Sequence, residues 1–140
     1  MGATSLLVLV TVVLALYISP LVRASRLRKR ITKWSESHAS MTDEQFYESL
    51  KPMSVPKEGA ISVRSLVSGA VRIPQDLVYP DDTLSDLKKI GDPSHPSVVD
   101  YIADMSSIES VEEEDDLTTV RDLVAKFGLA LAQSESEPRL

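Results

Sequence analysis

The sequence predicts an all-α protein in which a single N-terminal transmembrane helix precedes a small bundle of helices. Three observations support this prediction. The 21 residues Gly2–Val22 carry no charge, and a helix of about this length crosses a ~30 Å hydrocarbon core. Apolar residues in the second half recur at the i, i+3, i+4, i+7 spacing of buried helix faces. No segment alternates apolar and polar residues as a half-buried strand would.

Basic residues follow the apolar segment directly. Six Lys or Arg side chains lie within the next eleven positions, and none precedes the segment. Positive charge flanking a membrane helix favours the cytoplasmic side, where anionic lipids attract it. We therefore predict a single-pass protein of the cell membrane, with its N-terminus outside and the following domain in the cytoplasm. The predicted membrane-flanking residues are Arg23, Arg26, Arg28, Lys29, Arg30 and Lys33. Tyr17 and Trp34 are interpreted as anchors at the interface, and the alternative for Trp34, about three turns beyond the apolar segment, is a return to the surface beside Lys33.

A cleaved secretory signal is the rival interpretation of residues 1–22. Such a signal has a basic start, an apolar core of about 7–15 residues and small residues at its cleavage site. Here Met1–Ser5 contains no basic residue, and Val22 and Arg23 stand where small residues belong. The sequence therefore favours an uncleaved anchor. An exported and purely structural tail remains the alternative to a cytoplasmic one.

The chain after the basic flank is strongly acidic. Residues 34–140 hold nine basic residues against all 21 acidic ones, a formal charge of −12, whereas the whole chain has −6. Nucleic-acid binding is excluded because it needs a basic face to neutralise phosphates. An acidic surface attracts proteins with basic patches. The absence of cysteine excludes disulfides, thiol catalysis and cysteine metal sites.

Composition divides this part of the chain into a linker, a domain and a tail. Residues 23–55 form the basic juxtamembrane segment and linker, in which Ser35–Ser40 predicts a flexible joint. Thr42 and Gln45 have the spacing of a capping box, so a short helix should run to about Leu50. Residues 56–128 form the helical domain. Residues 129–140 are polar without a helical stripe and are predicted to be disordered.

Proline, threonine and glycine residues mark the predicted ends of the helices in the domain. Pro56 suits the start of a first helix, which ends at Ile73-Pro74. The following segment, Ile73–Leu87, is predicted as a long loop. A second helix should run from Pro96 or Ser97 to about Met105, and a last one from a Thr118 or Thr119 cap to Gly128. The expected core residues are Val63, Leu66, Val67, Ala70, Leu77, Val78, Leu84, Leu87, Val98, Val99, Ile102, Met105, Val120, Leu123, Val124 and Phe127.

The order of these elements between Ile61 and Phe127 resembles the acyl carrier protein family. Residues 63–67 are similar to the first helix of the family, residues 73–87 to its long loop and residues 117–124 to its threonine-capped last helix. The resemblance implies an acyl-carrier-like helical bundle. In the family, the serine of an Asp-Ser-Leu motif carries 4'-phosphopantetheine at the start of the second helix.

That motif is absent from this chain. His95 stands where the serine belongs, between Ser94 and Pro96, and an imidazole cannot form the same phosphodiester. We therefore expect no cofactor and no enzymatic activity. The alternative is a working carrier in which a shifted register places 4'-phosphopantetheine on Ser94 or Ser97. In either case a helix N-terminus would favour the phosphate group.

Acidic side chains are the remaining candidates for a binding surface. Asp86, Asp100, Asp104 and the run Glu112–Asp116 are predicted contacts for a protein with a basic patch. The run lacks the glycine-punctuated alternation of a calcium loop, so a solvated acidic face is favoured over a cation site. His38 is interpreted as a surface residue without a role. The predicted function is that of a membrane-anchored, non-catalytic protein-interaction module.

Overall fold

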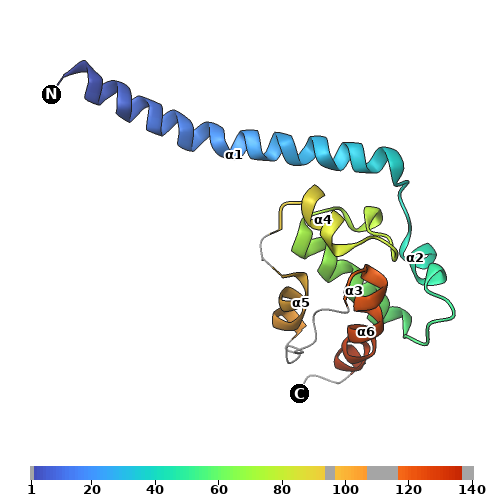
Figure 1. The fold of residues 1–140 in the computed structure, drawn as a ribbon. Helices are drawn as coiled ribbons and strands as arrows, with labels where there is room; N and C mark the ends of the chain where they lie inside the picture. The colour runs from blue at the N-terminus through green and yellow to red at the C-terminus, as the bar shows by residue number, and fades with distance from the viewer. Residues whose placement is uncertain (1, 94–96, 107–116, 137–140) are drawn as a thin grey trace.

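The computed structural model confirms an all-helical chain (Figure 1) over the residues that it describes, which are 2–93, 97–106 and 117–136. Thr83 and Thr119 form an isolated antiparallel bridge, and the described residues form no β-strand. The elements are α1 (Ala3–Ser37), α2 (Asp43–Ser49), α3 (Lys57–Val71), the short 3-10 helix η1 (Gln75–Leu77), α4 (Leu84–Ile90), α5 (Val98–Ser106) and α6 (Val120–Ser136).

Helix α1 contains both the apolar segment and the basic flank. It runs for 35 residues without a break and passes through Pro20, and none of its residues is fully buried. It is long and apolar enough to cross a membrane. The predicted joint at Ser35–Ser40 is wrong in its first half, because α1 continues through Ser37. The physical reason is that Ile31 and Trp34, in its last turns, pack against the core of the domain.

Helix α2 begins at the predicted capping box. The Thr42 hydroxyl accepts a hydrogen bond from the Gln45 backbone at 3.2 Å, and the Gln45 side chain accepts one from the Thr42 backbone at 2.9 Å. Phe46 of this helix is fully buried. The capping box therefore also sets the direction in which α2 presents Phe46 to the core.

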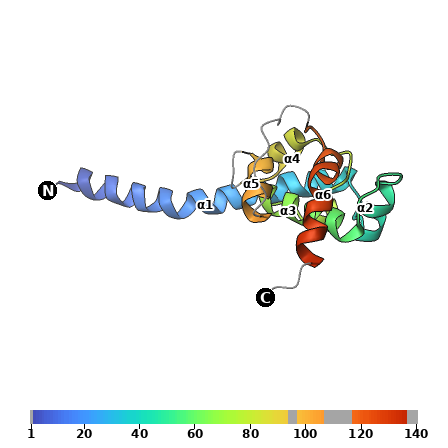
Figure 2. The same ribbon diagram turned by 90° about the horizontal axis from the view of Figure 1, so that it is seen from below.

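The core of the domain forms around α3, which contacts α2, η1, α5 and α6. Both views show α3 inside the group of shorter helices (Figures 1 and 2). Most predicted core positions are buried, but Leu66 is only partly buried and Met105 is 62% exposed. The confirmed positions are Val63, Val67, Ala70, Leu77, Val78, Leu84, Leu87, Val98, Val99, Ile102, Val120, Leu123, Val124 and Phe127.

Gly128 lies inside α6 and does not end it, contrary to the sequence prediction. A Cβ atom at this position would lie 2.5 Å from Cγ1 of Val55, so the glycine provides room for a packed neighbour. The helix continues to Ser136 and buries Leu131. The predicted disordered tail is therefore wrong for residues 129–136, which extend the packed helix.

The segment Ile73–Leu87 contains more regular structure than the predicted loop. It includes η1 and the start of α4, which the Thr83 hydroxyl caps by accepting from the Asp86 backbone at 3.1 Å. Leu84 and Leu87 are buried, as their apolar side chains predict. The threonine cap and the i, i+3 spacing of Leu84 and Leu87 are both typical of a helical turn, which explains why α4 forms here.

Asp122 completes the threonine cap of α6. Its carboxylate accepts hydrogen bonds from the backbones of Thr118 and Thr119, both at 3.0 Å, and from the Thr118 hydroxyl at 3.1 Å. The Thr119 hydroxyl accepts from the Asp122 backbone at 3.3 Å. Partial burial raises the pKa of Asp122, but the hydrogen bonds from Thr119 and Thr118 together hold it below its ordinary value of 3.8.

We expect Asp122→Asn to lower the free energy of unfolding at neutral pH. A carboxyl whose pKa is depressed by folding stabilises the protein above pH 3.8 and loses that effect as the pH falls through its folded pKa. The difference between wild type and Asp122→Asn should therefore shrink below about pH 3.8. Chemical denaturation of the detergent-solubilised chain over a pH series measures it, and a difference that stays constant would contradict this account.

Candidate functional site at the junction of α1 and the domain

Trp34 attaches the last turns of α1 to the domain. Its indole Nε1 donates to the backbone oxygen of Leu77 at 3.1 Å. Its ring stacks on His38, with the ring centroids 3.7 Å apart and the planes 17° from parallel. Trp34, interpreted from the sequence as an anchor at the membrane interface, therefore contacts the protein in this structure.

His38 is part of the same junction and is not a free surface residue. Its Nε2 lies 3.0 Å from Oδ1 of Asp82, and its ring lies 4.8 Å from that of Tyr79. Asp82 is only 9% exposed and also accepts from the Tyr79 backbone at 2.8 Å. Burial raises the pKa of Asp82, while the hydrogen bonds from Tyr79 and His38 act in the opposite direction. His38 therefore stabilises a carboxylate that burial alone would disfavour.

We expect His38→Ala to destabilise the chain by about 1–3 kcal/mol, because it leaves a buried acceptor without one of its donors. Urea unfolding followed by circular dichroism measures this change. His38→Gln is the matched control, since its amide can still donate near the position of Nε2. If the loss is equally large in a background that already carries Asp82→Asn, the His38–Asp82 contact is not its cause.

Arg30 provides a second attachment one helical turn before Trp34. Its Nε donates to the backbone oxygen of Ile90 at 3.0 Å, and its Nη2 donates to that of Gly91 at 3.4 Å. These carbonyls belong to the C-terminal end of α4, where a positive charge is favourable. Arg30 and Trp34 together hold the domain beside α1 in a fixed position.

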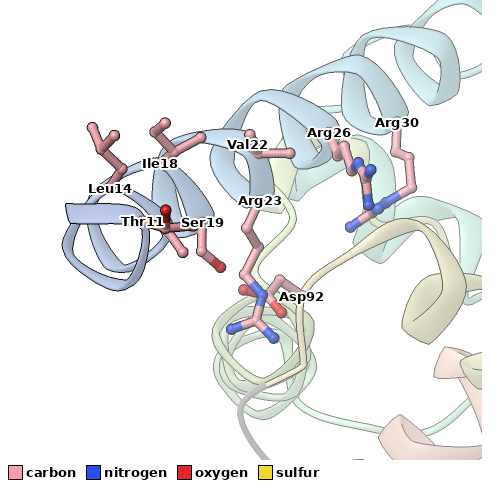
Figure 3. Close-up of a pocket in the computed structure, with 10 residues that line it drawn as sticks. Thr11, Leu14, Ile18, Ser19, Val22, Arg23, Arg26, Arg30 and Asp92 are labelled. Atoms are coloured by element: carbon pink, nitrogen blue, oxygen red, sulfur yellow. The ribbon is translucent and has the colours of Figure 1, made fainter. Parts of the chain in front are cut away.

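The predicted membrane-flanking residues separate into faces of α1. Arg23, Arg26 and Arg30 point toward the domain and line a groove between α1 and Asp92 (Figure 3). Arg28 and Lys29 do not line this groove. Lys33 lines a separate hollow with Trp34 and Ile90.

The predicted acidic contacts come from two helices. Asp86 lies exposed in the first turn of α4. Asp100 and Asp104 are four residues apart on α5, the first half-buried and the second exposed, so they share one face. Both views place α5 on the side of the domain nearest the N-terminal half of α1, and α2 at the opposite side (Figures 1 and 2).

Ser97 has a structural role at the start of α5. Its hydroxyl accepts from the Asp100 backbone at 3.2 Å, as an N-cap does. Ser94, His95 and the run Glu112–Asp116 lie outside the described residues. Among the residues with described positions, no group of His, Asp or Glu could hold a metal ion.

Comparisons with known proteins do not assign the chain to a family. No protein-family model, curated protein or solved structure matches the chain.

Proposed function

We propose that the chain is a membrane-anchored, non-catalytic interaction module with an acyl-carrier-like domain. In this proposal α1 spans the cell membrane with its N-terminus outside, and the domain lies in the cytoplasm. Support comes from the exposed apolar side chains between Leu6 and Val22, a surface far larger than soluble proteins leave uncovered. The basic residues that follow favour the cytoplasmic side.

The junction is the observation on which the proposal depends. A flexible tether would let the domain move away from the bilayer, whereas Arg30 and Trp34 hold it against the continuation of the membrane helix. Asp92 lies in one groove with Ser19 and Val22, at the end of the apolar segment. In this proposal the domain therefore rests at the membrane surface, with α5 toward the lipid.

Single cysteines test the anchor and its direction, because the natural chain has none. We expect a membrane-impermeant maleimide to label Gly2→Cys in intact cells and to label Ser134→Cys only after lysis. Labelling of Ser134→Cys in intact cells would show an exported tail. An intact mass that lacks residues 1–22 would instead show a cleaved signal.

The partner in this proposal is a membrane protein with a basic patch near the cytoplasmic surface. Helix α5, which carries Asp100 and Asp104, lies on the side of the domain that faces the membrane in this proposal. Complementary charge raises the rate of encounter and limits the choice of partner. A protein whose own basic residues lie close to the bilayer would be placed to meet this helix.

We expect Asp100→Lys/Asp104→Lys to abolish capture of membrane proteins by the full chain, because reversed charge repels a basic patch. The matched control is Glu44→Lys/Glu48→Lys, which reverses two charges four residues apart on α2. Their exposed pairs with Lys57 and Lys51 contribute little to stability. Affinity purification from solubilised membranes at increasing salt gives the measurement. Capture that is unaffected by salt and by the α5 reversal would rule out this mechanism.

A working carrier is the second candidate, and the order of the helices favours it. Ser97 already caps α5, so Ser94 is the better position for the 4'-phosphopantetheine group. Incubation of the full chain with coenzyme A and a broad-range phosphopantetheinyl transferase, followed by intact-mass measurement, tests it. An added group that Ser94→Ala abolishes would establish the carrier, and an unchanged mass would reject it.

A further inference from the structure

The groove between α1 and the domain changes from apolar to basic along its length. It has a volume of about 660 Å³ and includes Leu14, Ile18 and Val22 toward the N-terminus of α1. Arg23 and Arg26 follow, and Figure 3 shows Arg23 ending beside Asp92 and the guanidinium groups of Arg26 and Arg30 lying next to each other. A phospholipid matches this change along the groove, because its apolar acyl chains are followed by a negatively charged phosphate.

Positive charge in the groove exceeds the negative charge that faces it. Asp92 is its one lining carboxylate among the described residues, and it already pairs with Arg72 at 3.4 Å. Arg72 and Arg23 line an adjoining hollow of about 530 Å³, which shares Asp92 with the groove. Within the described chain, the side chains of Arg23 and Arg26 make no hydrogen bond or ion pair. Guanidinium groups so placed are suited to grip a phosphate.

We propose that this groove binds the headgroup phosphate of an anionic phospholipid, with Arg23 and Arg26 as its ligands and Arg72 close by. The proposal rests on α1 spanning the membrane. The arginines lie at the end of the apolar segment, which is the depth of the headgroups in the leaflet. Leu14, Ile18 and Val22 then face the part of an acyl chain that is nearest the headgroup. The bound lipid would join α1 to the domain at a point where Asp92 alone leaves positive charge unbalanced.

The test uses the full chain in nanodiscs of mixed phosphatidylcholine and phosphatidylglycerol, with native mass spectrometry of the lipids that it retains. We expect wild type to retain phosphatidylglycerol selectively. Arg23→Gln/Arg26→Gln should weaken that retention by about tenfold or more for each charge-assisted hydrogen bond that the variant removes. Arg28→Gln/Lys29→Gln is the matched control, because it removes the same charge from two side chains of α1 that do not line the groove. It should retain the lipid nearly as well as wild type.

A second variant changes retention in the opposite direction, which misfolding could not imitate. Asp92→Asn removes the carboxylate that competes with the phosphate, and we expect it to increase retention of phosphatidylglycerol severalfold. Equal losses in the two double variants would reduce the effect to general surface charge and overturn the proposal. Displacement by excess inorganic phosphate would overturn the lipid as ligand. Failure of the chain to enter nanodiscs would instead overturn the membrane anchor itself.

Discussion

Replacing Arg64 by methionine is expected to lower the free energy of unfolding by about 2–6 kcal/mol, because two backbone acceptors lose their donor and each such loss costs about 1–3 kcal/mol. Arg64 lies in α3 and is 1% exposed. Its Nε donates to the Val78 oxygen at 3.1 Å and its Nη2 to the Met41 oxygen at 2.8 Å. Its Nη1 pairs with Asp43 at 2.8 Å. Methionine keeps much of the length of the side chain but leaves the backbone oxygens of Val78 and Met41 without this donor, whereas Asp43 still accepts from Gln75 at 3.0 Å.

The effect should extend to the junction with α1. Met41 and Asp43 lie where the segment after α1 leads into α2, so Arg64 fixes that segment to α3. We therefore expect Arg64→Met also to expose residues 39–43 to limited proteolysis, as loosened connections are. Arg64→Lys is the control, since it keeps the charge but cannot reproduce the planar fork that makes three separate contacts. A methionine variant within about 1 kcal/mol of wild type in urea unfolding would show that these hydrogen bonds contribute little.

The sequence predicts local features well because neighbouring residues determine them. The capping box at Thr42 and Gln45 needs only two side chains at fixed spacing, and the structure contains it. The stripe Val120, Leu123, Val124 and Phe127 predicts one face of α6, and these residues are buried. Both patterns follow from helical geometry and need no knowledge of the rest of the chain.

The junction could not be predicted in the same way, because its partners are far apart in the sequence. His38 and Asp82 are separated by 44 positions, and Trp34 and Leu77 by 43. Nothing next to His38 indicates a buried carboxylate. Arg64 did leave a signal, since it shares a helical face with Val67 and Val71, and a cation on a buried stripe needs several acceptors. The prediction that Gly128 ends α6 is wrong because the sequence does not distinguish a glycine that ends a helix from one that makes room for a packed neighbour.

Gly59→Ala is expected to destabilise the domain by more than about 2 kcal/mol, although alanine favours helices over glycine by about 1 kcal/mol. Gly59 lies in α3 where that helix meets α6. A Cβ atom there would lie 1.8 Å from the backbone oxygen of Gly128 and 2.7 Å from its carbonyl carbon. Backbone atoms, unlike a side chain, cannot relieve this overlap by changing rotamer, so α3 and α6 would have to separate. Their contact is the most extensive one in the domain.

Gly69→Ala in the same helix separates this steric effect from helix propensity. A Cβ atom at Gly69 would meet only the side chain of Tyr101, whose hydroxyl oxygen lies 3.2 Å away, and that side chain can move. We therefore expect Gly69→Ala to be neutral or to stabilise the domain by up to about 1 kcal/mol. Urea unfolding of both variants decides between the two effects. If Gly59→Ala is as stable as Gly69→Ala, the close approach of α3 to α6 at Gly59 does not contribute to the stability of the domain.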